Sequence, residues 1–171
     1  MSQITFKRIT TSDNNTYIGL VHGEKRREGV GQMELEDNSK ISAIYKYDRL
    51  TGLVYMEKQE GDIFFGDYKD NKKNGVGVNL YQGCLFVGYF KDNETNGFGI
   101  KKQLNLQIES TFDSKGLYSG FSRVVYPNQN ITYTGNFVEN EISGFGLLTG
   151  DVNYTGEYKA GNEHGRGIKV F

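Results

Sequence analysis

One short phrase recurs along the chain and constrains its fold more than any other feature. It consists of an aromatic residue, any residue, glycine, any residue, a second aromatic residue and, after about six residues, Gly-x-Gly. Seven repeats begin near residues 17, 41, 64, 86, 108, 133 and 154, at intervals of 21 to 25 residues. Self-similarity at a period of about 20 to 50 residues marks a repeat architecture, in which stacked copies of one small unit share a continuous core.

Within one repeat the two aromatic residues and the glycine between them point to the same side, because side chains alternate between faces along a strand. In repeat 3 these residues are Phe64, Gly66 and Tyr68, and the returning strand carries Gly75 and Gly77. We expect both paired glycines to be sockets for neighbouring rings, since burying a ring gains roughly 1.5 to 3 kcal/mol and a strand glycine costs roughly 0.5 to 1 kcal/mol. The rings expected to have this structural role are Tyr17, Phe64, Tyr68, Phe86, Phe90, Tyr133, Phe137, Tyr154 and Tyr158.

The segments between the aromatic phrase and Gly-x-Gly are typical of tight turns. Lys69-Asp70-Asn71, for example, ends on asparagine, which accepts a positive φ at low cost. Each repeat is therefore predicted to be a β-hairpin. Repeats 2 and 5 are degenerate: we assign Gly52 and Val54 to the glycine slots of repeat 2, and Ser119 and Phe121 to those of repeat 5.

These residues resemble the MORN (membrane occupation and recognition nexus) repeat, whose phrase is Tyr-x-Gly-x-Phe/Trp followed by Gly-x-Gly. The repeats that begin at Phe64, Phe86, Tyr133 and Tyr154 fit it closely, although the chain has no tryptophan. The resemblance implies an all-β fold: an elongated, twisted, single-layer antiparallel sheet of about seven stacked hairpins. It also implies a binding function, because family members hold partner proteins or, by an older proposal, phospholipids.

The predicted domain organisation is simple. Residues 1–16 are predicted to form half a repeat that caps the first edge, with a strand at residues 4–9. Residues 17–171 are predicted to form one continuous domain, because no Pro/Ser-rich linker interrupts them and the chain has only 1 proline beside 23 glycines. The last repeat runs to Phe171, so we expect no catalytic domain after it.

No pattern in the sequence indicates catalysis, a cofactor or a metal. The Gly-x-Gly pairs lack the third glycine and the helix of a dinucleotide site, and neither Gly-x-Ser-x-Gly nor Cys-x-x-Cys occurs. The formal net charge of −1, with acidic and basic residues interspersed, argues against nucleic acid. A single cysteine and the lack of an apolar signal or span lead us to expect an intracellular protein, soluble or in a large complex, in the cytoplasm or cytoskeleton.

The face opposite the rings is the first candidate binding surface, because a single layer cannot bury both faces and large apolar patches mark interfaces. The predicted partner-binding residues are Val76, Val78, Phe98, Ile100, Phe145, Leu147, Ile168, Val170 and Phe171. Two alternatives remain open: twist folds this stripe against neighbouring strands, or the aromatic face itself opens into a groove. The unpaired last strand, residues 168–171, is also predicted to pair with a partner or a second copy.

We therefore expect a non-enzymatic scaffold or adaptor that binds a segment of a partner protein, as a subunit of a larger cytoskeletal or ciliary assembly. The named assemblies are implied by the resemblance alone. The alternative function is a peripheral membrane tether that binds anionic phospholipid through Lys25, Arg26 and Arg27. That cluster is smaller than the usual lipid-binding patch of about 4 to 8 bases, so its simpler interpretation is a solvated turn.

Overall fold

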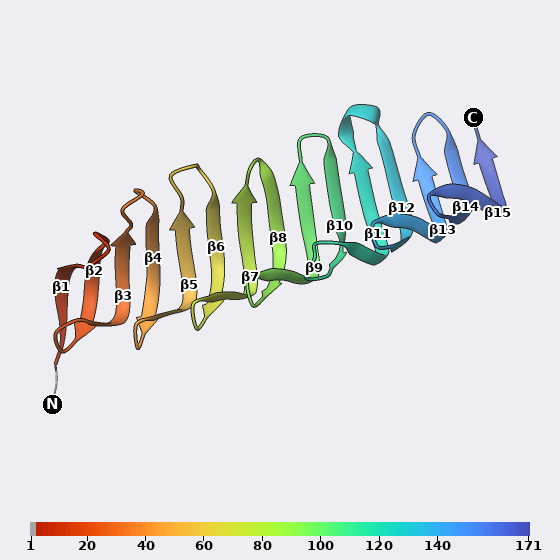
Figure 1. Cartoon of the computed structure of the whole chain (residues 1–171). Coiled ribbons are helices and arrows are strands. Elements are labelled where there is room, and N and C mark those ends of the chain that lie inside the picture. Colours follow the sequence, from red (N-terminus) through yellow and green to blue (C-terminus); the bar gives the residue numbers. More distant parts are fainter. Residues whose placement is uncertain (1–2) are drawn as a thin grey trace. The chain divides into compact units, whose positions relative to one another are not determined.

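The computed structural model of the chain describes residues 3–171, which fall into two compact units. The first unit comprises the residues up to 82 together with 90–93, and the second comprises 83–89 together with 94–171. The strands of the first unit, labelled in Figure 1, are β1 (Ile4–Thr10), β2 (Thr16–His22), β3 (Arg26–Glu34), β4 (Lys40–Lys46), β5 (Arg49–Glu57), β6 (Ile63–Lys69) and β7 (Lys72–Tyr81). Those of the second unit are β9 (Glu94–Gln103), β10 (Leu106–Phe112), β11 (Tyr118–Tyr126), β12 (Ile131–Val138), β13 (Glu141–Thr149), β14 (Asn153–Lys159) and β15 (Asn162–Val170), and β8 (Cys84–Lys91) contributes to both.

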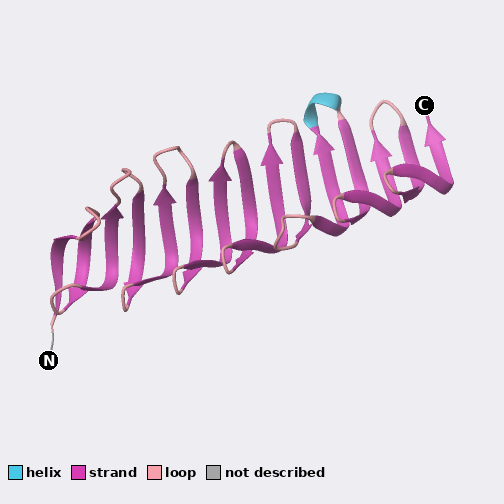
Figure 2. Ribbon diagram, in the orientation of Figure 1, coloured by secondary structure: helices cyan, strands magenta, loops and turns pink. Residues whose placement is uncertain are grey.

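Within each unit the strands pair antiparallel in chain order. The one helical element of residues 3–171 is the 3-10 turn η1 (Pro127–Gln129), drawn in cyan between β11 and β12 in Figure 2. The all-β class and the antiparallel sheet of hairpins are thus confirmed. The predicted half-repeat contains β1, which pairs with β2. That residues 17–171 form one continuous domain stays a prediction.

Two-residue turns close the hairpins because their residues tolerate the left-handed region. Asp70 and Asn71 have φ values of +50° and +67°, and Asp92 and Asn93 have values of +52° and +80°. Two successive residues with positive φ are the geometry of a type I′ turn, whose twist matches that of the flanking strands. The asparagine residues at the ends of these segments therefore predicted the turns correctly.

The first ring of a repeat lies over the bare backbone of two glycines in its own hairpin. In repeat 3 a Cβ atom added to Gly66 would lie 2.9 Å from Cζ of Phe64, and one added to the paired Gly77 would lie 2.8 Å from the same atom. The ring therefore requires glycine at both positions, which we call socket glycines. The other ring-bearing repeats have the socket pairs Gly19 and Gly31, Gly88 and Gly99, Gly135 and Gly146, and Gly156 and Gly167. The expectation that neighbouring rings fill the sockets was wrong, because each first ring leans along its own strand.

The first glycine of each Gly-x-Gly has a different role. Gly75 has a φ of +121°, and a Cβ atom added to it would approach Oδ2 of Asp67 to 2.7 Å instead of a ring. The strand register shifts between Gly66 and Tyr68 at this level, which indicates a β-bulge. The prediction that both paired glycines hold rings is therefore wrong for the first of them. The residues in this position, which we call bulge glycines, are Gly29, Gly52, Gly75, Gly97, Gly120, Gly144 and Gly165.

Repeat 5 corrects one sequence assignment. Its bulge glycine is Gly120, with a φ of +82°, and its socket residue is the buried Ser122. The assignment of Ser119 and Phe121 to these slots was wrong by one residue. The loop of this hairpin is longer, at residues 113–117, and the Asp113 carboxylate stabilises it by accepting hydrogen bonds from the backbone N–H groups of Lys115 and Leu117, at 2.8 and 2.9 Å.

Repeats 2 and 5 fill the socket with larger residues and place a smaller residue above it. In repeat 5 the Oγ atoms of Ser110 and Ser122 lie 2.6 Å apart, and both residues are almost fully buried. The residue above them is Ile108, where other repeats have a ring. The equivalent residues of repeat 2 are Ile41 above the buried Ala43 and Val54. Volume lost above the socket is thus regained inside it, as close packing demands.

Rings join one repeat to the next by edge-to-face packing. The Phe64 ring meets the Phe90 ring of the following repeat at a centroid distance of 5.5 Å and an interplanar angle of 82°. Tyr133 and Tyr158 meet in the same way at 5.2 Å and 88°. Such aromatic pairs contribute about 0.5 to 1.5 kcal/mol beyond the area they bury.

Hairpin turns form a second connection between repeats. The backbone N–H of Asn71 donates to the carbonyl of Leu50 at 3.1 Å, and the N–H of Leu50 donates to Oδ1 of Asn71 at 2.7 Å. We call this two-bond arrangement the turn clasp. The same two bonds join Asp48 to Arg27, Asn93 to Lys73, and Asn140 to Tyr118.

The socket rule can be tested in repeat 5. We expect Ile108→Phe alone to lower the free energy of unfolding by about 1 to 3 kcal/mol, because the ring overpacks the serine-filled socket. Ser110→Gly with Ser122→Gly should destabilise the natural chain but stabilise the Ile108→Phe chain. Urea unfolding of the four proteins measures both effects. A glycine pair that acts in the same direction in both backgrounds would contradict the rule.

The turn clasp can be tested with glycine, which accepts a positive φ without strain. Asn71→Gly removes only the side-chain bond to Leu50 and should lower the free energy of unfolding by about 1 kcal/mol. The matched control is Asp70→Gly, which removes an exposed ion pair with Arg49 of 3.2 Å and should cost less than about 0.5 kcal/mol. Equal losses in thermal or urea unfolding would show that the clasp adds nothing.

Candidate protein-binding surface

The aromatic face is closed by its own packing. All nine rings given a structural role from the sequence are buried, with exposed fractions from 1% for Tyr17 and Tyr133 to 7% for Tyr68. Rings buried to this extent are not accessible to a partner. The hypothesis of a groove lined by these rings therefore has no support within residues 3–171.

Cationic side chains cover part of this face. Nζ of Lys73 lies 4.4 Å from the centroid of the Phe64 ring and donates a hydrogen bond of 2.6 Å to Oδ1 of Asn79. The guanidinium of Arg27 lies 5.0 Å from the centroid of the Tyr45 ring. Burial lowers the pKa of Lys73, because the ammonium loses water that the rings only partly replace.

Tyrosine hydroxyls on the aromatic face stay protonated. Burial raises the pKa of Tyr45, Tyr133 and Tyr158 to about 12, since the phenolate would lose its hydration. A hydroxyl with so high a pKa is a poor acid or base near neutral pH. The role that the structure gives these side chains is packing.

The second face, opposite the rings, is open. Of the predicted partner-binding residues, Val76, Phe98 and Phe145 are 49%, 58% and 60% exposed. Ile100, Leu147, Ile168, Val170 and Phe171 are also exposed, whereas Val78 is half-buried. The alternative in which twist folds this stripe against neighbouring strands is therefore not supported.

Sequence reasoning missed further apolar residues on the second face. Val30, Leu53 and Phe65 are exposed there in the first unit, and Phe121 is 73% exposed in the second. Val30 and Leu53 lie between the two glycine slots of repeats 1 and 2, so their position in the motif was sufficient to predict that they are exposed on the second face. Phe121 was overlooked because the one-residue error in repeat 5 placed it in a glycine slot.

In the second unit the exposed residues form two parallel rows across the strands. One row contains the pairs Phe98–Thr111 and Phe121–Asn136 together with Phe145, and it is interrupted at the bulges, where Thr111 pairs with Ser119. The other row contains Ile100, Glu109, Arg123, Thr134 and Leu147 in continuous register. Three phenylalanines thus occupy every second strand of one face.

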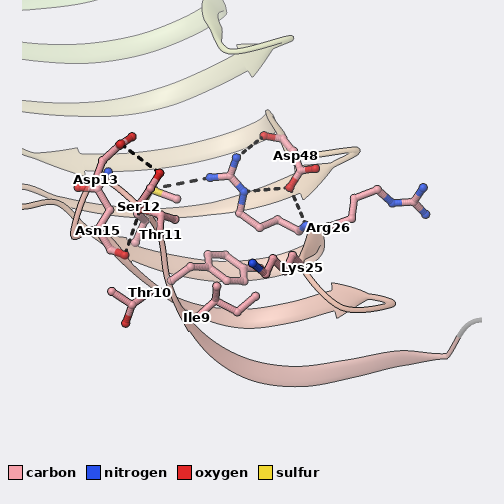
Figure 3. A pocket seen from close by; sticks show the side chains of 12 residues that line it. Ile9, Thr10, Thr11, Ser12, Asp13, Asn15, Lys25, Arg26 and Asp48 are labelled. Atoms are coloured by element: carbon pink, nitrogen blue, oxygen red, sulfur yellow. Dashed lines mark hydrogen bonds and ion pairs between the residues drawn. The ribbon is translucent and has the colours of Figure 1, made fainter.

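The basic turn considered for lipid binding is largely engaged within the protein. Nε of Arg27 lies 3.1 Å from the Asp48 carboxylate, and Nε of Arg26 lies 3.9 Å from that of Glu28. Lys25 has no carboxylate partner within residues 3–171. The three bases line a hollow of about 620 Å³ beside the turn after β1 (Figure 3), but the carboxylates neutralise most of its positive charge.

The last strand, predicted to pair with a partner or a second copy, is β15. Its predicted contact residues Ile168, Val170 and Phe171 are 71%, 55% and 92% exposed, and Phe171 follows the strand. β15 pairs with β14 on one side. Addition of a further strand to it stays a prediction.

Metal and membrane sites were also sought in the structure. Residues 3–171 contain no group of three or more His, Cys, Asp or Glu side chains that could hold a metal ion. They also form no helix with the length and apolar character required to cross a bilayer.

The repeats that carry these rings and glycines match the sequence model of a known family. The model of the MORN repeat matches residues 64–78, 86–102, 133–151 and 154–171, which are repeats 3, 4, 6 and 7. The chain belongs to the MORN repeat family. MORN repeats are in general non-enzymatic modules that bind proteins or lipids. Comparison with curated proteins gives no match to this MORN chain.

The different roles of the two faces can be measured on one matched pair of phenylalanines. Phe90→Ala should lower the free energy of unfolding by about 3 to 5 kcal/mol, because it empties a buried site. Phe121→Ala, on the second face, should lower it by less than about 1 kcal/mol. Chemical unfolding measures both. An unchanged midpoint for Phe90→Ala would mean that this ring is displayed for binding rather than packed.

Proposed function

We propose that this MORN protein is a non-enzymatic scaffold that holds a partner protein against its second face. The observation that carries the proposal is the contrast between the faces. The aromatic face buries its rings, whereas the second face leaves Phe98, Phe121 and Phe145 more than half exposed. Apolar surface that a fold does not need for its own core is typical of protein-binding sites.

The chemistry of the second face favours a protein over other ligands. Aromatic and aliphatic side chains make up half of the two rows, and the charged residues among them, Glu109 and Arg123, form an ion pair of 3.0 Å. Protein interfaces are enriched in phenylalanine and arginine and depleted of unpaired charge at their centre. A face with exposed aromatic side chains and a paired Glu109 and Arg123 suits another protein surface better than a phosphate or a nucleic acid.

Membrane tethering is the weaker candidate. It would require basic side chains free to meet anionic headgroups, yet Arg27 is bound to Asp48 at 3.1 Å and stacks over Tyr45 at 5.0 Å. A patch of about 4 to 8 free bases is the usual requirement for lipid attraction. A setting in a cytoskeletal or ciliary assembly is part of the proposal and rests on the family resemblance alone.

Affinity capture with tagged protein tests the scaffold proposal. We expect Phe98→Asp to abolish capture of proteins that the natural chain retains, because a carboxylate in the centre of an apolar interface loses its hydration. The matched control is Leu104→Asp, at a residue 92% exposed in the loop between β9 and β10, which should leave capture unchanged. Quantitative mass spectrometry compares the three samples. Identical protein sets for Phe98→Asp and the natural chain would exclude the second face as the binding site.

A further inference from the structure

We propose that the second face of the second unit binds a second copy of this chain, forming a homodimer around a two-fold axis at β11. The inference names the partner of the surface described above and therefore rests on the proposed function. Its contact residues lie on β9 to β13. We call them the phenylalanine patch, which consists of Phe98, Ile100, Glu109, Thr111, Phe121, Arg123, Thr134, Asn136, Phe145 and Leu147.

The phenylalanine patch is regular. Phe98, Phe121 and Phe145 are 58%, 73% and 60% exposed and lie on β9, β11 and β13. Thr111 and Asn136 lie between them on the intervening strands. Since neighbouring strands are about 4.8 Å apart, successive rings are about 10 Å apart across the sheet.

The patch is also symmetric about β11. The two strands next to β11 carry short polar side chains, Thr111 on β10 and Asn136 on β12. The next strands outward each carry a phenylalanine and an aliphatic residue, Phe98 with Ile100 on β9 and Phe145 with Leu147 on β13. A two-fold interface places the same patch of both copies in contact, and the same order of side-chain types on both sides of β11 brings like residues together across such an axis.

An axis parallel to β11 and midway between two facing sheets gives a specific arrangement. It places β9 of one copy over β13 of the other, so that Phe98 faces Phe145 and Phe121 faces its own equivalent. Arg123 near the axis is neutralised by Glu109 at 3.0 Å, so the centre carries no unpaired cation. The net charge of −1 adds little repulsion between copies.

The area is sufficient for a modest dimer. From the exposed fractions and the size of these side chains, the patch offers on the order of 700 Å² per copy, so that a dimer buries about 1,400 Å² in total. Stable interfaces bury about 1,200 to 2,000 Å² in total. The patch is thus large enough for a second copy to cover it.

Sedimentation equilibrium of the purified chain alone tests the dimer. We expect the mass to rise from one chain to two with increasing concentration. Phe121→Asp should weaken association at least about 100-fold, because the symmetric interface carries the substitution twice. The matched control is Leu53→Asp, in the equivalent position of repeat 2 in the first unit, which should leave the dimer intact. Circular dichroism confirms that each variant is folded.

Mixing two charged variants tests the position of the axis. Phe121→Asp and Phe121→Lys should each be monomeric, and their equimolar mixture should regain the dimer because position 121 faces itself. A monomeric natural chain at high micromolar concentration, a dimer that survives Phe121→Asp, or a mixture that stays monomeric would overturn the proposal. If the purified chain is monomeric but Phe98→Asp still loses captured proteins, the dimer fails while the scaffold function stands.

Discussion

A ring lying over bare backbone is the interaction on which the rest of this structure depends. A single-layer sheet has no second layer to bury its side chains against, so each first ring must bury itself against its own hairpin. Phe64 does so because Gly66 and Gly77 present no side chain beneath it. The ring edge is then covered by the second ring of the next repeat, as Phe90 covers Phe64. The contacts that bury the rings are therefore also the contacts that join one repeat to the next.

The exceptions show that the constraint is one of volume rather than of glycine as such. Ile108 leaves space that Ser110 and Ser122 fill, and the two hydroxyls satisfy each other at 2.6 Å in a site without water contact. A serine pair in a socket below a ring would overlap it, and a glycine pair below isoleucine would leave a void. Bulge glycines behave differently: repeats 2 and 5 retain Gly52 and Gly120, because a positive φ depends on the backbone and not on the ring above.

Sequence alternation predicted a large part of this fold for a physical reason. A period of two assigns each residue to a face, so the buried rings and the exposed Phe98 and Phe145 follow from spacing alone. A bulge interrupts that period, and the residue types in Gly75-Val76-Gly77 do not show which glycine lies under the ring and which forms the bulge. The turn clasp was missed because Asn71 and Leu50 are 21 residues apart, a contact that exists only after two hairpins have stacked. The longer loop of repeat 5 shifted the sequence assignment by one residue, so that Phe121 was assigned to a glycine slot although it lies on the second face.

The two constrained glycines of each repeat leave one position between them whose side chain is free. The socket needs no side chain on the aromatic face, and the bulge needs a positive φ, but the residue between them projects into solvent on the second face. That residue is Val30, Leu53 or Val76 in the first unit and Phe98, Phe121, Phe145 or Arg166 in the second. Because it contributes little to the core, its identity can change without loss of the fold. If the second face binds a partner as proposed, a surface built from such positions separates recognition from stability, because the residues that would meet the partner are not those that hold the core.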